Sequence, residues 1–549
     1  MAAPASTPVS PPGVDEVTPH PTRSHVVGAD EKKEKNVTVQ TAPSVISIGE
    51  APAQRGWLSK FQAGFRIGRA SQASTPVYQP RPIPSESSTI WARLWKFVKF
   101  LGPGAVISVA YVDPDNYQTA ISSGATFQYK LLFMVLVSNL IAIYIQSLCI
   151  KLGTVTGLDL AQMNHKSLPR WLELILYVIA EASIIATDLG QVIGTAIALN
   201  ILIPKLPLPA ACVLSVFETL LILLFYTHTG EMRRIRMFEI FVSLLVIVVF
   251  VTICVALSMV TGSARDVFRG FVPSREIFVD TGLYASCAIL GGTLMPHALY
   301  VGTALSRARL QEYDVKHNLI PEEDPSASTD TLKYRPSLRA IKSCMGYSIA
   351  ELSFTLFTVA IFVNSALVII SGSAFYDPES DDQVSDDLYD LYNLFSDTIA
   401  PAAGVMFALS LLFSGISAGI VSTMAGQIVM EGAFNIRISP FLRRLLTRCV
   451  AIIPALIIAV SVGQDGLSKA MVACNYLLAI ALIPITFPII YYTGLSKYMS
   501  VPADDGIGTV SLKNNVPTAV VAWVLWALVV VMDVATVVLV GLGITKDDG

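Results

Sequence analysis

Charged residues are scarce in this sequence. Asp, Glu, Lys and Arg make up 14% of its 549 residues, whereas soluble proteins have roughly 25%. Hydrophobic residues make up 53%, and the mean hydropathy is +0.59. This balance predicts an integral membrane protein that is surrounded by the lipid bilayer. The net charge of −3 gives no attraction to nucleic acid, so we expect no nucleic-acid partner.

The sequence also lacks the motifs of enzymes and ATP-driven pumps. It contains no P-loop and no nucleophile–base constellation, so we predict neither an enzyme nor an ATPase, and no cofactor. The seven cysteines form no Cys-x-x-Cys pair, which favours a packing role. The opening residues, "MAAPASTPVSPPG", lack the apolar core of a cleavable signal peptide. The first spanning helix is therefore expected to act as the membrane signal.

Three regions differ in composition. Residues 1–92 are rich in Pro, Ser, Thr and charge, which predicts a disordered cytoplasmic tail. A transmembrane helix needs about 20 mostly apolar residues, and such segments predict a ten-helix core over 93–495. A linker, an eleventh helix and a short tail follow in 496–549. The candidate spans are 97–125, 130–152, 171–201, 208–227, 236–261, 281–306, 345–371, 400–430, 446–464, 468–494 and 516–542.

Basic residues fall mainly in alternate loops, which predicts a cytoplasmic N-terminus. The loop 373–398 has many acids and no Lys or Arg, and we expect it outside. The loop 262–280 carries three arginines and is a mild exception. Eleven spans then place the C-terminus outside. The plasma membrane and endosomal or vacuolar membranes all fit this orientation.

Proline interrupts the first and the sixth candidate spans. Pro114 breaks the first span within "VISVAYVDPDNYQTAIS", and Pro296 breaks the sixth within "GGTLMPHALY". A proline removes a backbone donor and frees carbonyl groups. Paired interruptions in two halves of a membrane protein indicate a transporter binding site. A simple proline kink is the alternative for either helix taken alone.

Polar residues accompany both interruptions. Asp113 and Asn116 flank the first, and Met295 and His297 flank the second. A carboxylate at membrane depth is costly and marks a functional site. Together these groups offer carboxylate, amide, thioether and carbonyl ligands to a cation. The thioether favours a transition-metal ion over Mg²⁺ or Ca²⁺, unless Met295 is a packing residue.

Four motifs resemble the Nramp divalent-metal transporters, and in particular their fungal members. They are "DPDN" at 113–116, "ATDLGQVIGTAIALN" at 186–200, "LMPHALY" at 294–300 and "SAGIVSTMAGQIVMEG" at 417–432. The resemblance implies an all-α, LeuT-like fold of two inverted five-helix repeats, at about 97–261 and 281–494, plus the eleventh helix. It also implies import of Mn²⁺, Fe²⁺ and related ions, usually coupled to protons.

The resemblance further implies roles for individual residues. Asp113, Asn116 and Met295 match the metal-binding side chains of the family. The carbonyls of Ala110 and Gly292 match its backbone ligands, although the family often has Ala at the second position. Asn475 stands where the family commonly has Gln, and it could close over the ion.

The sequence departs from the family pattern at two places near the interruptions. Asp115 stands where the family usually has Gly. Its carboxylate either strengthens cation attraction or simply faces the aqueous vestibule. Gly302 stands where many members have a second histidine, so a model that needs two histidines is weakened.

A proton route is expected beside the metal site. His297 is the only histidine well inside a span, and its ordinary pKa suits proton exchange unless its role is structural. Glu181 and Asp188 are seven residues apart and share a helix face. The resemblance implies a proton exit along this face, with a second acid where Gln191 stands. It also implies a role for the arginines of "RRLLTR", which are Arg443, Arg444 and Arg448; charge anchoring is their alternative.

These features predict a monomeric secondary transporter that moves a transition-metal dication into the cytosol by alternating access, with protons as the coupling ion. Potential-driven uniport is a mechanistic rival, because a dication gains energy from the membrane potential alone. Two further hypotheses are a sodium-coupled symporter of organic solutes and a non-transporting metal sensor. Three acids elsewhere in the spans are expected to form interhelical hydrogen bonds: Glu218, Glu351 and Asp533.

Overall fold

The computed structural model describes most of the chain beyond its first hundred residues. The described residues are 97, 102–223, 232–260, 262–317, 319, 334–376, 388–399, 401–434, 440–503 and 508–541. The tail predicted over 1–92 lies outside them.

The first half contains the first proline interruption. Two short helices replace one long one, and five helices follow. They are α3 (Pro103–Val109), α4 (Pro114–Phe127), α5 (Leu132–Thr156), α6 (Leu160–Ser167), α7 (Arg170–Leu202), α8 (Leu208–Leu223) and α9 (Met232–Met259).

The second half repeats this pattern after a short connecting region. The connection holds α10 (Ala264–Gly270) and the 3₁₀ turn η1 (Arg275–Phe278). The second interrupted pair is α11 (Asp280–Thr293) and α12 (Pro296–Lys316). The remaining elements are α13 (Leu338–Thr355), the π-helical turn η3 (Leu356–Ala360), α14 (Ile361–Ala374), α15 (Leu388–Leu394), the π-helical turn η4 (Phe395–Ile399), α16 (Pro401–Phe434), α17 (Pro440–Ser461), α18 (Gln464–Gly494) and α19 (Val516–Gly541).

Each of the eleven predicted spans falls on one helix or on consecutive helices, so the prediction of an all-α membrane fold is confirmed. Within the described residues, seven helices or helix pairs are long and apolar enough to cross a membrane. The interrupted pair α11–α12 and the continuous run from α13 to α14 are among them. The outer faces of these helices are apolar. On α9, for example, Ile240, Leu244 and Ile247 are exposed, as expected for side chains that face lipid.

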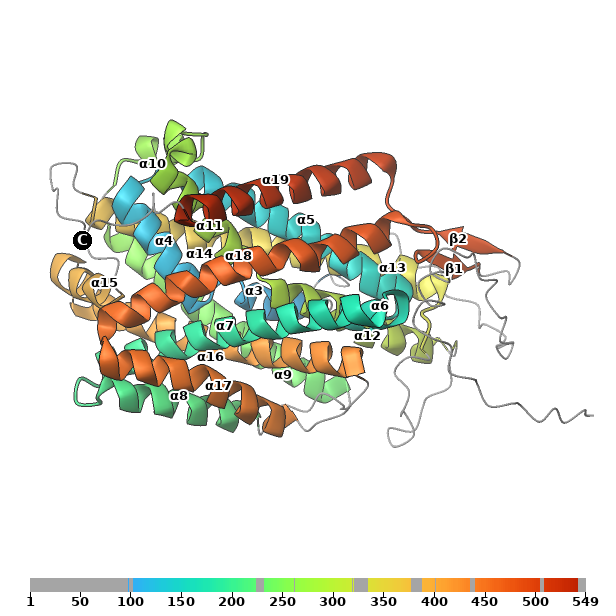
Figure 1. The fold of residues 1–549 in the computed structure, drawn as a ribbon, viewed down its shortest axis with the longest axis horizontal. Coiled ribbons are helices and arrows are strands. Elements are labelled where there is room, and N and C mark those ends of the chain that lie inside the picture. The colour runs from blue at the N-terminus through green and yellow to red at the C-terminus, as the bar shows by residue number, and fades with distance from the viewer. Residues whose placement is uncertain are drawn as a thin grey trace, which may run out of the picture. The chain divides into compact units, whose positions relative to one another are not determined.

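The linker before α19 contains a small β-ribbon that the sequence did not predict. Strands β1 (Ser500–Pro502) and β2 (Thr509–Ser511) pair antiparallel, with Val501 opposite Val510. Figure 1 shows this ribbon at the opposite end of the helices from α10 and α15. The side chain of Asn514 fixes the linker. Its Nδ2 donates to Thr493 Oγ1, and its Oδ1 accepts from Lys151 Nζ at 2.8 Å.

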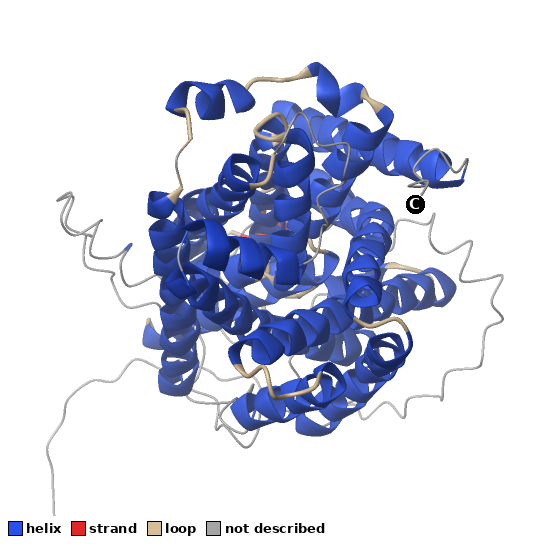
Figure 2. Ribbon diagram, turned by 90° about the vertical axis from the view of Figure 1, so that its left-hand side faces the viewer, coloured by secondary structure: helices blue, strands red, loops and turns tan. Residues whose placement is uncertain are grey.

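The two interrupted pairs lie inside the helix assembly. Helix α4 packs against α7, α11, α14 and α18, while α12 packs against α5, α13 and α16. Figure 2 looks onto the end of the helices that carries α10 and α15. Glycine allows close approach here: a Cβ on Gly194 of α7 would overlap the ring of Pro114. The polar groups at the interruptions are therefore shielded from lipid.

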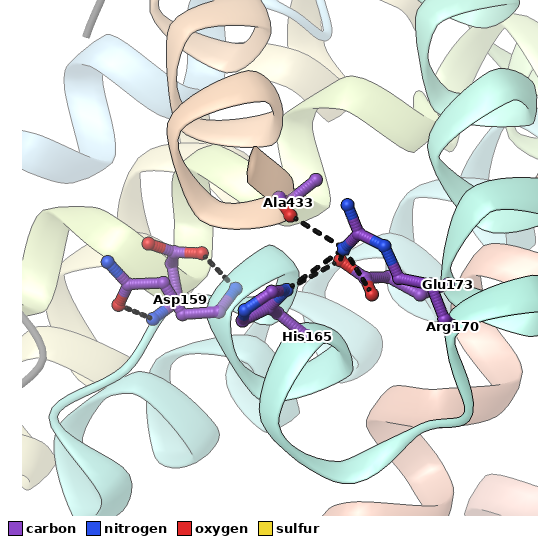
Figure 3. A network of polar contacts seen from close by, with 6 residues as sticks. Asp159, His165, Arg170, Glu173 and Ala433 are labelled. Carbon is purple, nitrogen blue, oxygen red and sulfur yellow. Dashed lines mark hydrogen bonds and ion pairs between the residues drawn. The ribbon is translucent and has the colours of Figure 1, made fainter. Parts of the chain in front are cut away.

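One end of the assembly is fixed by polar contacts (Figure 3), and we call it the basic end because Lys166, Arg170 and Lys316 lie there. Here α5 and α12 end and α7 begins. Asp159 caps α6 in a capping box with Gln162. Arg170 Nη1 donates to Glu173 Oε2 at 2.8 Å and to the carbonyl of Ala433 at 3.1 Å. The bond to Ala433 connects the start of α7 to the last turn of α16.

Candidate functional site

The first interruption spans the residues between α3 and α4. In an unbroken helix the carbonyl of Ala110 would accept from residue 114, which is proline and has no N–H. Asp113 is the N-cap of α4, and its Oδ1 accepts from the backbone N of Asn116 at 3.0 Å and from Asn116 Nδ2 at 2.9 Å. These bonds fix the carboxylate at the break and orient the amide beside it.

Side chains from distant helices hold this break open. Asn364 Nδ2 on α14 donates to the carbonyl of Tyr111 at 3.1 Å. Ser414 Oγ on α16 donates to the carbonyl of Val112. Backbone carbonyls that left the helical pattern are thus satisfied without water, as buried polar groups require.

The second interruption lies between α11 and α12. The carbonyl of Gly292 loses its helical donor in the same way, because residue 296 is proline. Met295 is fully buried, and as N-cap of α12 it forms no side-chain capping bond. Gln146 on α5 connects the two breaks, since its Nε2 donates to Tyr111 Oη and to the carbonyl of Ala298, both at 3.0 Å.

The two interruptions meet at Gly292. A Cβ added to this glycine would lie 3.2 Å from Asn116 Oδ1 and 3.6 Å from Asn475 Oδ1. Asn475 comes from α18, and its Nδ2 donates to Thr119 Oγ1 at 2.9 Å. Two amide oxygens from different helices therefore converge on a residue of the second break.

Several oxygens at this place have no hydrogen-bond partner. Asp113 Oδ2 and Asn475 Oδ1 are buried and accept no bond within the described residues. Such orphaned oxygens are costly unless a ligand satisfies them. The described residues contain no group of three His, Cys, Asp or Glu side chains that could hold a metal ion. A cation here would therefore also need ligands of other kinds, such as the amide oxygens near Gly292.

Asp115 does not face an aqueous vestibule, which was one of the two expectations. The residue is fully buried, and a Cβ on Gly190 of α7 would overlap its carboxylate. Neither of its carboxylate oxygens has a hydrogen-bond partner among the residues that the structure describes. The side chain is therefore directed toward α7.

The predicted proton route lies between α7, α12 and α16. His297 is buried, and its Nδ1 lies 3.4 Å from Thr187 Oγ1. Asp188, the next residue on α7, is an electrostatic neighbour of the same ring. Asp188 Oδ1 and Gln191 Oε1 both accept from Ser422 Oγ, at 2.7 and 3.3 Å. Polar groups from three helices are thus in contact beside the second break.

With this geometry in place, comparison with known proteins identifies the family. A family model described as "Natural resistance-associated macrophage protein-like", or Nramp, matches residues 104–539. The chain belongs to the Nramp family.

Three relatives illustrate the relationship. The manganese transporter SMF1 of Saccharomyces cerevisiae is 48% identical over 414 residues, which are 72% of this chain and 71% of that protein. The iron transporter SMF3 of the same yeast is 44% identical over 420 residues, which are 75% and 85% of the two chains. A solved manganese transporter of Eremococcus coleocola superposes with a TM-score of 0.69 at 28% identity, covering 85% of this chain and 91% of that one. The fold expected from the Nramp resemblance is confirmed by this match.

The remaining predicted residues stay predictions. Glu181 lies on α7, half-buried and seven residues before Asp188. Arg443, Arg444 and Arg448 lie on α17, but their side chains are outside the described part of the structure. The proton-route role of these four residues in this Nramp protein is therefore a hypothesis.

The expectation of interhelical hydrogen bonds holds for Glu351 but not for Asp533. Glu351 on α13 accepts from the backbone N of both Gly102 and Gly104 at 2.9 Å, so this expectation is confirmed. Asp533 on α19 is buried, but neither carboxylate oxygen has a hydrogen-bond partner within the described residues, so this expectation is wrong. The side chain of Glu218 is not described.

Sequence reasoning missed the residues that support the site. Two of them, Asn364 and Ser414, donate to backbone carbonyls of the first break. Ser422 donates to Asp188, and Gln146 joins the two breaks. The available signal was a polar residue in an apolar span, but each of these spans holds several polar residues. Because such residues also bond to their own helix backbone, the sequence alone does not select these four.

Proposed function

We propose that this protein imports a divalent transition-metal ion, such as Mn²⁺ or Fe²⁺, into the cytosol by proton symport with alternating access. The observation that carries the proposal is the orphaned carboxylate oxygen of Asp113, buried at the break where residues of both interrupted helices converge. The manganese and iron transporters among its relatives support the choice of substrate.

The ligand set also supports a transition metal. Asp113 provides the charge, and the amide oxygens of Asn116 and Asn475 lie around Gly292. Met295 follows three residues after Gly292 and is fully buried. A thioether favours softer ions, whereas Mg²⁺ and Ca²⁺ prefer oxygen shells. In this proposal Asp113, Asn116, Met295 and the carbonyls of Ala110 and Gly292 bind the ion, and Asn475 closes over it.

Contacts at the two sides of the site support alternating access. At the basic end, Glu351 binds the first turn of α3, and Arg309 Nη2 lies 3.6 Å from Glu239 Oε2. On the other side of the break a small cavity adjoins Asn116 and is lined by residues of α4, α5, α11 and α14, among them Thr119. The basic end faces the cytosol in this proposal, and the N-terminus lies on the same side.

Proton coupling is assigned to the contacts beside the second break. His297 and Asp188 receive the proton, and Glu181 continues the path along α7 toward the basic end. The arginines of α17 would help its release. A single chain contains all of these groups, so a monomer suffices.

The test is Mn²⁺ uptake into vesicles that contain the purified full chain and a pH-sensitive dye. We expect Mn²⁺ entry to acidify the interior. Asp113→Asn should abolish both signals, whereas the control Asp266→Asn, at an exposed position on α10, should leave them unchanged. Mn²⁺ uptake without acidification would contradict symport and favour uniport. Equal uptake by Asp113→Asn would contradict the proposed site.

A further inference from the structure

Asp115 is a buried acid that is not among the proposed ligands of the metal ion. In the described part of the chain both of its carboxylate oxygens lack a hydrogen-bond partner, and the residue is fully buried. Within the described residues no Lys, Arg or His forms an ion pair with it. A charge in this position is strongly unfavourable unless an opposite charge is nearby.

The space for this side chain is provided by one glycine. Gly190 on α7 has no Cβ, and any Cβ there would overlap the Asp115 carboxylate. The carboxylate therefore occupies a gap between α4 and α7, and Asp113 is the charged group whose field acts on it. Asp115 follows Asp113 by two residues and precedes Asn116, so it lies directly behind the first break.

Asn475 links Asp115 to the ion position. Asn475 Nδ2 lies 3.5 Å from the backbone carbonyl of Asp115, while Asn475 Oδ1 is orphaned and lies near Gly292. The same asparagine thus contacts the backbone of Asp115 and presents a free oxygen at the second break. An ion beside Gly292 would be surrounded by oxygens and attracted by the carboxylates of both Asp113 and Asp115.

We infer that Asp115 is a second, non-ligating charge that determines how strongly the site attracts a dication. This inference rests on the proposed metal-transport function. Asp113 and Asp115 together carry two negative charges, which balance a dication and leave the loaded site neutral. Coulomb attraction depends on charge and distance and not on the softness of the ion. Asp115 should therefore strengthen the binding of every dication to the same extent.

The test is calorimetric titration of the purified full chain with Mn²⁺ and with Cd²⁺. Asp115→Asn keeps the shape and removes the charge, and we expect both affinities to fall by a similar factor of roughly tenfold or more. Asp115→Gly, which removes the side chain altogether, should give the same result. Asp266→Asn should change neither affinity. Thermal melting of each variant verifies that it is folded.

A second readout separates charge from structure. With Asp115 neutralised, the loaded site carries one positive charge, so Mn²⁺ uptake into vesicles should depend more steeply on an imposed membrane potential. A purely structural role for Asp115 would not change this dependence.

The outcomes distinguish the two proposals. If wild-type protein binds neither ion, or if Asp113→Asn binds as well as wild type, the proposed function is wrong. If Asp113→Asn loses binding but Asp115→Asn and Asp115→Gly bind both ions as tightly as wild type, only the inference about Asp115 is overturned. It is also overturned if the affinity for one ion falls and the other does not, because Asp115 would then be a ligand.

Discussion

The two interrupted helices are built differently. At the first break, Asp113 caps α4, and side chains of α14 and α16 bond to the backbone of Tyr111 and Val112. At the second break, Met295 is the N-cap of α12 and forms no side-chain capping bond. The first break therefore carries a carboxylate and is cross-linked by α14 and α16, whereas the second carries no acid and is bonded by Gln146 at the carbonyl of Ala298.

This difference assigns separate tasks to the two breaks. A carboxylate attracts every dication, and its attraction is strong where water is excluded. A thioether contributes little charge but discriminates between soft and hard ions. We therefore expect changes at the first break to alter the strength of binding and the stability of the fold, and changes at the second to alter selectivity.

The largest change of selectivity should come from Met295→Ala. Loss of the sulfur should reduce the preference for Mn²⁺ over Ca²⁺ by roughly tenfold, or about 1.4 kcal/mol, while Mn²⁺ uptake continues at a lower rate. Competition of Ca²⁺ against Mn²⁺ uptake in vesicles measures this preference. Met424→Ala, at another buried methionine on α16, is the control. Unchanged competition by Ca²⁺ would show that Met295 is a packing residue.

The next effect concerns the cross-links of the first break. Asn364→Ala leaves the carbonyl of Tyr111 buried without its donor, which should cost about 1–3 kcal/mol of stability. Thermal melting should show the loss, and saturating Mn²⁺ should restore part of it because the ion binds the folded state. Thr358→Ala is the matched control, since its hydroxyl donates only to its own helix region. Equal melting temperatures for both variants would contradict the cross-link.

The sequence predicted the residues of the breaks more fully than their supports. Proline, aspartate and methionine at membrane depth each carry a local signal, so Asp113, Met295 and His297 could be selected directly. The donors Asn364 and Ser414 lie more than two hundred residues from the carbonyls that they reach. No local pattern encodes such a pairing. The direction of Asp115 likewise depends on Gly190 on another helix, which a single sequence does not reveal.

Two adjacent glycines of α11, just before the second break, should differ in their effect when each is replaced by alanine. A Cβ on Gly292 would lie nearest to the side-chain oxygens of two asparagines, at 3.2 and 3.6 Å, so Gly292→Ala should weaken Mn²⁺ binding by no more than about threefold. A Cβ on Gly291 would lie 2.8 Å from the backbone carbonyl of Asn475. Gly291→Ala should therefore lower the melting temperature clearly more than Gly292→Ala. The reverse order would show that the second break is not held by packing against α18.

The smallest effect on Mn²⁺ binding is expected from a carboxylate outside both breaks. Burial raises the pKa of Asp159, at the basic end, to about 6 from an ordinary value of 3.8. The folded protein thus binds the proton of the Asp159 carboxyl more tightly than the unfolded chain does. The contribution of this carboxyl to the stability of the fold is therefore complete below a pH of about 4 and is lost as the pH rises through about 6. Asp159→Asn keeps a good N-cap and lacks this dependence.

The melting temperature of Asp159→Asn, relative to wild type, should therefore rise between a pH of about 4.5 and about 7.5. Its Mn²⁺ affinity should equal that of wild type, because Asp159 lies at the start of α6 and not at either break. Asp266→Asn, at an exposed aspartate, serves as the control for a removed surface charge. A melting difference that stays constant with pH would contradict the shifted pKa. A weakened Mn²⁺ affinity would show that charge at the basic end also acts on the ion, and the separation of the breaks from the rest of the protein would then be incomplete.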